Sequence, residues 1–188
     1  MDTRQTLLAA ALRVLEREGE AQFSTRAVCA LADVTAPTLY HHFGSADGLL
    51  SAAVMEAFAQ FLAGKRAAVQ SSDAETALAQ GWDNYVRFAA DRPRLYAAMV
   101  GRFLQGAKIP AADQARALLM ERIAAIAAEG RLALDAEAAA DLAWASAHAA
   151  ALLYVTAATR KPSPRVIAGL RDGMLQTICK PRKKAGRA

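Results

Sequence analysis

The stretch VTAPTLYHHF, residues 34–43, decides the fold of the N-terminal part of this chain. Thr35 is a good N-cap for a helix, and Pro37 falls in the first turn, where its missing N–H costs little. Leu39 and Phe43 are four residues apart and therefore share one face. The pattern predicts a short helix with an apolar inner side.

The outer side of the same helix is expected to be polar. Successive residues in a helix are about 100° apart, which places a group of polar or ring-bearing side chains opposite Leu39. A helix with a purely structural role does not need this mixture. Adjacent histidines point in different directions and make a poor metal-binding pair, so we expect no metal site. The outer group comprises Pro37, Thr38, Tyr40 and His41, with His42 on the flank.

Two more short helices are predicted before this one. The first runs from about Asp2 to Glu18 and stops at Gly19. Ser24 or Thr25 can cap the second, which continues to about residue 32. Three short helices, the last with an exposed polar side, form the pattern of a helix-turn-helix unit, whose later helix enters the major groove of DNA.

The residue types in this unit suit DNA chemistry. Hydroxyl groups on the third helix match phosphate oxygens, and His41 can donate to a phosphate or a base edge. Ala36 and Pro37 are small and apolar, which suits contact with a thymine methyl group. Arg26, near the start of the second helix, can donate two hydrogen bonds to guanine. By position alone, Tyr40 and the histidines fit an ordinary surface equally well.

The remainder of the chain is also expected to be helical. Hydrophobic residues make up 54% of the 188 residues, and no segment alternates as strands do. The later helices are predicted over about 46–66, 73–90, 93–104, 111–128, 135–159 and 164–179. We expect an all-α fold of about nine helices, with a helix-turn-helix domain over residues 1–46, a ligand-binding and dimerisation domain over 47–179, and a disordered basic tail over 180–188.

Charge and cysteine content bear on the setting of the protein. The net charge of +5 divides unevenly, because residues 1–50 hold four arginines against six acidic residues while residues 180–188 hold five cations. Cys29 and Cys179 lack a partner motif, which favours a reducing compartment. We see no signal peptide, and the uncharged run 142–159 suits a buried helix better than a membrane span. We therefore expect a cytoplasmic protein without membrane contact.

Residues 6–50 resemble the DNA-binding domain of the TetR family of transcriptional regulators. The matching pieces are LLAAALRVLEREG, FSTRAVCALADVTAPTLYHHF and GSADGLL. The resemblance implies phosphate and base contacts from the second helix, recognition by the third, and a backbone contact from His42. The predicted DNA-binding residues are Thr25, Arg26, Thr35, Ala36, Pro37, Thr38, Tyr40, His41 and His42.

Two positions depart from the family pattern. Ala46 stands where the family usually has a phosphate-binding lysine, and Asp33 stands where it usually has the turn glycine. Aspartate tolerates a left-handed turn better than most residues. Each lost phosphate contact lowers the salt slope of DNA binding by about 0.9. We call residues 1–50 the head. Together with the excess of acidic residues in the head, these changes predict weak, shape-sensitive DNA binding.

The second half carries weaker resemblances to the same family in YVRFAADRPRLYAAMV, residues 85–100, and LAWASAHAAALLYV, residues 142–155. The family implies a homodimer built from the last two helices and a ligand cavity among the middle ones. Core packing explains any single bulky residue better, and His148 suits a satisfied core histidine. The candidate ligand-binding residues are Phe58, Phe61, Trp82, Tyr85, Phe88, Tyr96, Met99, Phe103, Met120, Trp144 and His148.

We therefore predict a repressor that binds a palindromic operator in double-stranded DNA as a homodimer and is released by a small apolar or aromatic effector. No cofactor is expected. A helical enzyme is disfavoured because no nucleophile, base and orienting group occur together. A helical ligand carrier or protein-interaction module without sequence-specific DNA binding remains the alternative, since the head is acidic.

Overall fold

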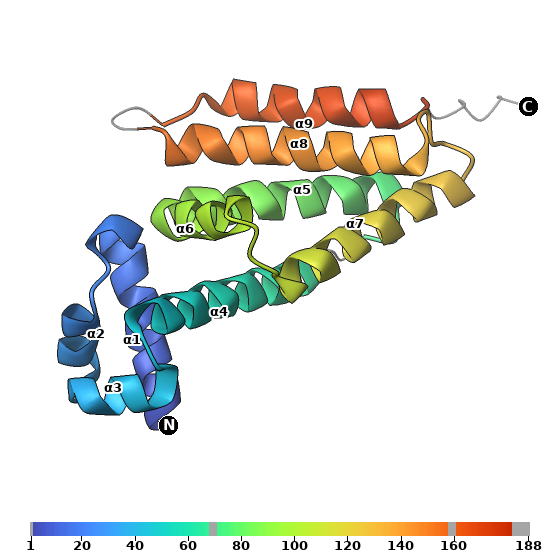
Figure 1. Cartoon of the computed structure of the whole chain (residues 1–188). Coiled ribbons are helices and arrows are strands. Elements are labelled where there is room, and N and C mark those ends of the chain that lie inside the picture. Colours follow the sequence, from blue (N-terminus) through green and yellow to red (C-terminus); the bar gives the residue numbers. More distant parts are fainter. Residues whose placement is uncertain (1, 68–70, 158–160, 182–188) are drawn as a thin grey trace, which may run out of the picture. The chain divides into compact units, whose positions relative to one another are not determined.

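The computed structural model describes residues 2–67, 71–157 and 161–181 of the chain, and the regular elements of these residues are helices joined by turns and loops (Figure 1). The all-α prediction is confirmed. Within these ranges the only strand-like pairing is an isolated bridge between Leu132 and Cys179. The elements are α1 (Thr3–Glu18), η1 (Glu20–Gln22), α2 (Thr25–Ala32), α3 (Ala36–Phe43), α4 (Ala46–Ala67), α5 (Ala74–Asp91), α6 (Pro93–Leu104), α7 (Pro110–Ala128), α8 (Ala136–Val155) and α9 (Pro164–Ile178).

Side-chain caps place several of these helix starts where the sequence predicts them. Ser24 accepts the N–H of Ala27 at 3.2 Å at the start of α2. Asp73 and Asp135 cap α5 and α8 in the same way, with N–H···O distances of 2.9 Å. The short 3₁₀ turn η1 was not expected, because EAQ carries no capping or periodic signal.

The C-terminal boundaries differ slightly from the prediction. Helix α8 ends at Val155, short of the expected residue 159. The backbone N–H of Lys180 donates to the carbonyl of Arg131 at 2.6 Å, so Lys180 is attached to the folded part rather than to a tail. The rest of the predicted tail, residues 182–188, lies outside the described residues.

The chain forms two compact units, which do not coincide with consecutive halves of the sequence. The first contains Met1–Ala63 and Asp91–Ala112, and the second contains Gly64–Ala90 and Asp113–Ala188. Helix α6 therefore belongs with the helix-turn-helix. It packs against α1, and two ion pairs attach this segment to the unit, Arg92–Glu16 at 3.2 Å and Arg102–Asp47 at 2.5 Å.

The second unit has its core between α5, α7, α8 and α9. Leu78, Trp82 and Val86 of α5 pack with Ile123 and Ile126 of α7 and with the small side chains of α8. The indole N–H of Trp82 donates to the Ser146 hydroxyl of α8 at 2.8 Å. Alanines let α8 come close to its neighbours, and α8 and α9 lie side by side (Figure 1). Its buried alanines are Ala139, Ala140, Ala143, Ala147, Ala150 and Ala151.

Two helices are long and apolar enough to cross a membrane by length and composition. They are Ala46–Gly64 within α4 and Ala136–Val155, which is α8. Each buries part of its surface against the protein, as a core helix does. These segments do not indicate a membrane protein.

Candidate nucleic-acid interface

Helix α3 has the two-sided character that its spacing predicts. Leu39 is fully buried and Phe43 is half-buried, which fixes the inner face against the first unit. On the outer face, Tyr40 is 44% exposed, and Pro37 and His41 are also exposed. Because Leu39 and Phe43 are four residues apart and both pack inward, they set the rotation of the helix about its axis, and the polar side chains face solvent.

The start of α3 differs from the expected capping. Thr35 occupies the N-cap position, but its side chain accepts no backbone N–H. Its hydroxyl instead pairs with the Thr38 hydroxyl at 3.0 Å. Pro37 in the first turn removes one of the N–H groups that a cap could satisfy. The result is a pair of hydroxyls at the N-terminal end of α3, the end that contacts bases in helix-turn-helix proteins.

The turn between α2 and α3 depends on Asp33. Its φ of 54° and ψ of 49° place it in the left-handed region, the conformation expected at the position of the missing glycine. It is the one non-glycine residue with positive φ in the described part of the chain. The N–H groups of Asp33 and Val34 both donate to the Cys29 carbonyl, which closes the end of α2. This closure sets the direction in which α3 leaves α2.

Helix α2 presents its predicted contact residues near its start. Arg26 is exposed and Thr25 is half-buried, while Val28 is fully buried and fixes the inner face. Cys29, on the same helix, is half-buried.

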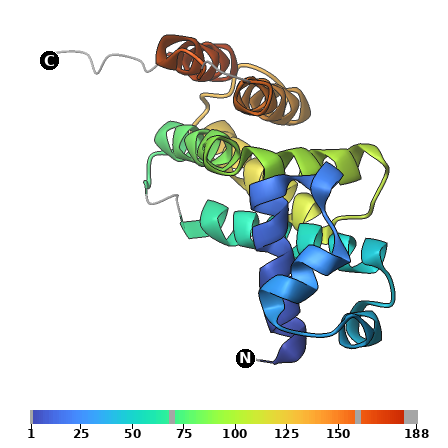
Figure 2. The ribbon, with the colours of Figure 1, turned by 90° about the vertical axis from the view of Figure 1, so that its left-hand side faces the viewer.

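The C-terminal end of α3 carries a row of rings. His41 and His42 contact edge to face with centroids 5.4 Å apart, and His42 contacts Phe43 in the same way at 6.4 Å. The guanidinium carbon of Arg4 lies 5.2 Å from the centre of the Phe43 ring. The sequence alone gives no signal for this contact, because only the packing of α1 on α3 brings the two residues together (Figure 1). Figure 2 shows α1, in dark blue, beside the other helices of the helix-turn-helix, in lighter blue.

The start of α4 lacks the family's cation. Ala46 is the exposed first residue of the helix. The Ser45 hydroxyl accepts the N–H of Gly48 at 2.9 Å and caps it. Asp47, beside Ala46, is paired with Arg102, whose side chain is 16% exposed. The pair partly offsets a negative charge at the edge of this surface.

The candidate ligand-binding residues are divided between the two units. The bulky residues of α4 and α6 belong to the first unit, and those of α5, α7 and α8 belong to the second. Their burial also differs, because Phe61, Trp82, Tyr96 and Met99 are buried whereas Phe103 and Trp144 are 50% and 45% exposed. Phe58, Tyr85, Phe88, Met120 and His148 are half-buried.

Trp144 and His148 form a stacked pair on α8, with centroids 5.2 Å apart and an interplanar angle of 12°. Burial lowers the pKa of His148, because a low-dielectric environment disfavours the charged imidazolium.

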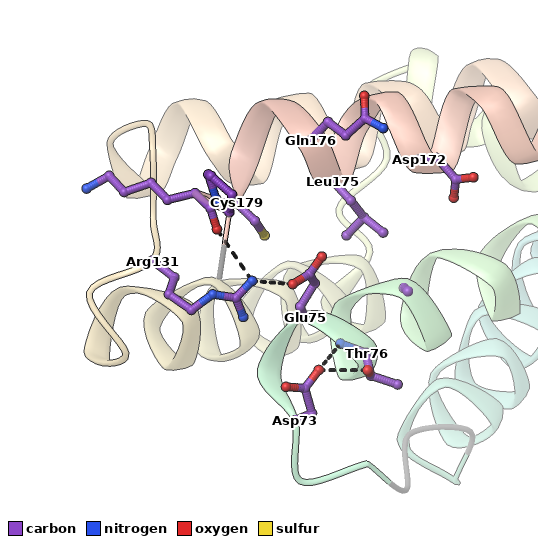
Figure 3. Close-up of a pocket in the computed structure, with 11 residues that line it drawn as sticks. Asp73, Glu75, Thr76, Arg131, Asp172, Leu175, Gln176 and Cys179 are labelled. Atoms are coloured by element: carbon purple, nitrogen blue, oxygen red, sulfur yellow. Dashed lines mark hydrogen bonds and ion pairs between the residues drawn. The ribbon is translucent and has the colours of Figure 1, made fainter. Parts of the chain in front are cut away.

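A groove of about 680 Å³ in the second unit lies at the start of α5 and the end of α9 (Figure 3). Arg131 crosses it to pair with Glu75, and also donates to the Lys180 carbonyl at 3.5 Å. Burial raises the pKa of the Cys179 thiol in its wall. None of the candidate ligand-binding residues lines this groove. The Arg131 guanidinium in this groove links the start of α5, through Glu75, to the end of the C-terminal segment, through Lys180. The groove is therefore better explained as a structural junction between these segments.

The described residues contain no group of three or more His, Cys, Asp or Glu side chains that could hold a metal ion. The exposed polar side of α3, with its neighbours on α2, is therefore the best-defined candidate site. Its chemistry is that of hydroxyl, imidazole and guanidinium groups on a helix-turn-helix scaffold.

Comparisons with known proteins agree with this geometry. The sequence model of the family described as "Bacterial regulatory proteins, tetR family" matches residues 7–53. Among proteins of curated function, none matches the chain. A solved protein of unknown function from Rhodococcus sp. RHA1 is 25% identical with a TM-score of 0.81, covering 96% of this chain and 97% of that one.

Two solved regulators share the fold at lower identity. A bacterial regulatory protein in the tetR family from Rhodococcus RHA1 is 21% identical with a TM-score of 0.72, covering 96% of this chain and all of that one (100%). A TetR-family transcriptional regulator from Haemophilus influenzae RD is also 21% identical, with a TM-score of 0.65 and coverage of 95% and 97%. The similarity of fold thus extends along nearly the whole chain.

Proposed function

We propose, from the match of residues 7–53 to the TetR family and from the helix-turn-helix geometry, that this chain is a cytoplasmic transcriptional repressor of the TetR type that binds a palindromic operator as a homodimer. A small apolar or aromatic effector, bound in the region of residues 47–179, releases it from DNA. Regulators of this family are transcription factors rather than enzymes.

The exposed outer side of α3 carries the proposal. Tyr40 and His41 face solvent, and the Thr35–Thr38 hydroxyl pair stands at the N-terminal end of the helix. In a helix-turn-helix that end meets base edges while hydroxyls and imidazoles hold phosphates. Arg26 on α2 is exposed and long enough to reach a guanine.

The outer surfaces of α8 and α9 support a homodimer. Trp144, Leu152 and Val166 are exposed apolar residues on these helices. Gly169 and Gly173 of α9 lie four residues apart, and an added Cβ at either would meet no atom within 4 Å. A glycine inside a helix costs about 1 kcal/mol relative to alanine, so two on one open face suit close approach of a second backbone.

Effector binding would act by changing the distance between the two heads. The heads of the dimer must reach half-sites about 34–36 Å apart. The chain passes from α3 through Gly44 and Ser45 directly into α4, so a tilt of α4 would move the head. A coupling of about 1–3 kcal/mol would weaken operator binding roughly 5–150-fold.

Selection of bound fragments from random duplex DNA tests the proposal. We expect a palindromic site, because a twofold dimer reads two equal half-sites. Arg26→Ala should weaken binding by about 1–3 kcal/mol and relax specificity at one base position. Tyr40→Ala should weaken binding to all sequences alike. Arg17→Ala, an exposed arginine on α1, is the matched control and should bind as the unmodified protein does.

The competing function is a ligand carrier or protein-interaction module, which the excess of acidic residues in the head favours. Such a protein would show no salt-dependent binding to duplex DNA. Unchanged operator affinity in both Arg26→Ala and Tyr40→Ala would reject the groove assignment and favour this alternative.

A further inference from the structure

We propose that Arg4 is an additional DNA-backbone contact, held in place by the ring of Phe43, and that it replaces the phosphate-binding cation absent at Ala46. This inference rests on the proposed DNA-binding function. It adds a residue from α1, outside the two helices that supply all the contacts expected from the sequence.

The geometry places a cation beside the recognition helix. The Arg4 guanidinium carbon lies 5.2 Å from the centre of the Phe43 ring, within the range of a cation–π contact. Phe43 is the last residue of α3 and is half-buried, so its ring is a fixed support. A stacked guanidinium keeps its N–H edges available for a phosphate. Arg4 remains exposed to solvent.

The charge of Arg4 is also not neutralised by an ion pair within the described residues, unlike that of two other arginines in the same unit. Arg92 and Arg102 are paired with Glu16 and Asp47, respectively. No carboxylate of the described residues forms an ion pair with Arg4. A positive charge without an internal counterion, next to a DNA-binding helix, is available to replace counterions on DNA.

The position on the helices favours phosphate over a base. The N-terminal residues of a recognition helix contact base edges, so its C-terminal end lies nearer the DNA backbone than the bases. Arg4 lies in the first turn of α1 and contacts the C-terminal residue of α3. It should therefore strengthen binding to every sequence without changing which sequence is preferred.

The experiment measures how the affinity of the full-length protein for DNA varies with salt. Two probes are used, a duplex selected from random sequences and an unselected duplex of equal length. The variants are Arg4→Ala and Arg13→Ala. Arg13 is exposed on the same helix, nine residues from Arg4, and therefore points about 180° away from it. Arg13→Ala thus removes an equal charge from the opposite side of α1.

For a dimer with two heads, Arg4→Ala should lower the slope of log affinity against log salt by about 1.8, which is twice the value for one phosphate. Between about 50 and 200 mM salt, the unmodified protein should then lose about 12-fold more affinity than the variant. Arg13→Ala should keep the original slope. Sequence preference should be the same in all three proteins.

A second pair of variants tests the role of the ring. Phe43→Tyr keeps an aromatic face under Arg4 and should keep most of the affinity, while Phe43→Leu keeps the bulk but removes the aromatic face and should weaken binding to both duplexes. Thermal unfolding of both variants controls for damage to the head. Equal slopes and affinities for Arg4→Ala and the unmodified protein would overturn the inference. Absence of salt-dependent binding by the unmodified protein would reject the proposed function, and this inference with it.

Discussion

At the scale of single residues, Asp33 closes the turn between α2 and α3 in a conformation that reduces the stability of the first unit. Its φ of 54° is strained for a residue with a Cβ. Its carboxylate also stands at the C-terminal end of α2, where the helix dipole disfavours negative charge. The turn is nevertheless formed, because the N–H groups of Asp33 and Val34 both donate to the Cys29 carbonyl.

Asp33→Gly should therefore stabilise the first unit by about 1 kcal/mol, since glycine adopts the left-handed conformation without strain. Removing a negative charge from the head should also strengthen binding to any duplex DNA. Thermal unfolding and DNA titration measure the two effects. Asp33→Ala serves as the control, because it removes the charge but keeps the Cβ, so it should gain DNA affinity without the gain in stability that comes from relieving the left-handed strain. A less stable Asp33→Gly variant would contradict this account.

Sequence spacing could predict the recognition helix at residue level but not its surroundings. Leu39 and Phe43 define its inner face through the helical repeat, and the exposure of Tyr40 and His41 follows from that. The Arg4–Phe43 contact could not be predicted, because it depends on how α1 packs on α3. Helical periodicity likewise gave no reason to place Trp144 on the outside of an alanine-rich helix.

At the scale of elements, capping residues and prolines set the helix boundaries. Ser24, Asp73 and Asp135 each accept an N–H at a helix start, so these starts could be predicted. The predicted boundary between the helices over 73–90 and 93–104 also agrees with the start of α6 at Pro93, since proline is tolerated in the first turn of a helix. The grouping of α6 with α1 was not predicted, because it depends on side chains such as Arg92 and Arg102 that meet distant partners.

The contact between α5 and α8 gives a prediction at this scale. Trp82 is 4% exposed, and its N–H donates to the Ser146 hydroxyl at 2.8 Å. Ser146→Ala should destabilise the second unit by about 1–3 kcal/mol, because a buried donor loses its partner. Chemical denaturation measures the loss. In a double-mutant cycle, adding Trp82→Phe should make Ser146→Ala nearly neutral, and an undiminished cost in that background would show that the hydrogen bond is not its source.

At the scale of the whole molecule, the exposed surfaces of α8 and α9 are relevant to whether two copies of the chain form a dimer. Gly169 and Gly173 leave a strip of α9 without side chains, next to the apolar residues of α8. Proteins seldom keep glycine in an exposed helix interior without a reason, since alanine would stabilise the helix. The proposed contact with a second copy of the chain would provide that reason.

Gly173→Glu should therefore convert the proposed dimer into a monomer that stays folded, because the new side chain meets no atom of its own chain at the Cβ position. Sedimentation equilibrium measures the change, and operator affinity should fall with it. Gly64→Glu on α4 is the matched control, because its Cβ position is equally open. A Gly173→Glu variant that remains dimeric would move the interface away from this face of α9.

The membership of α6 in the first unit limits how the protein can be re-engineered. A segment ending at residue 63 would lack Arg92 and Arg102, and would leave Glu16, Asp47 and the side of α1 that contacts α6 uncovered. The unit that contains the helix-turn-helix is thus built from two separate segments of the chain. Chimeras that graft a new specificity onto a relative's sensor should carry both pieces across together.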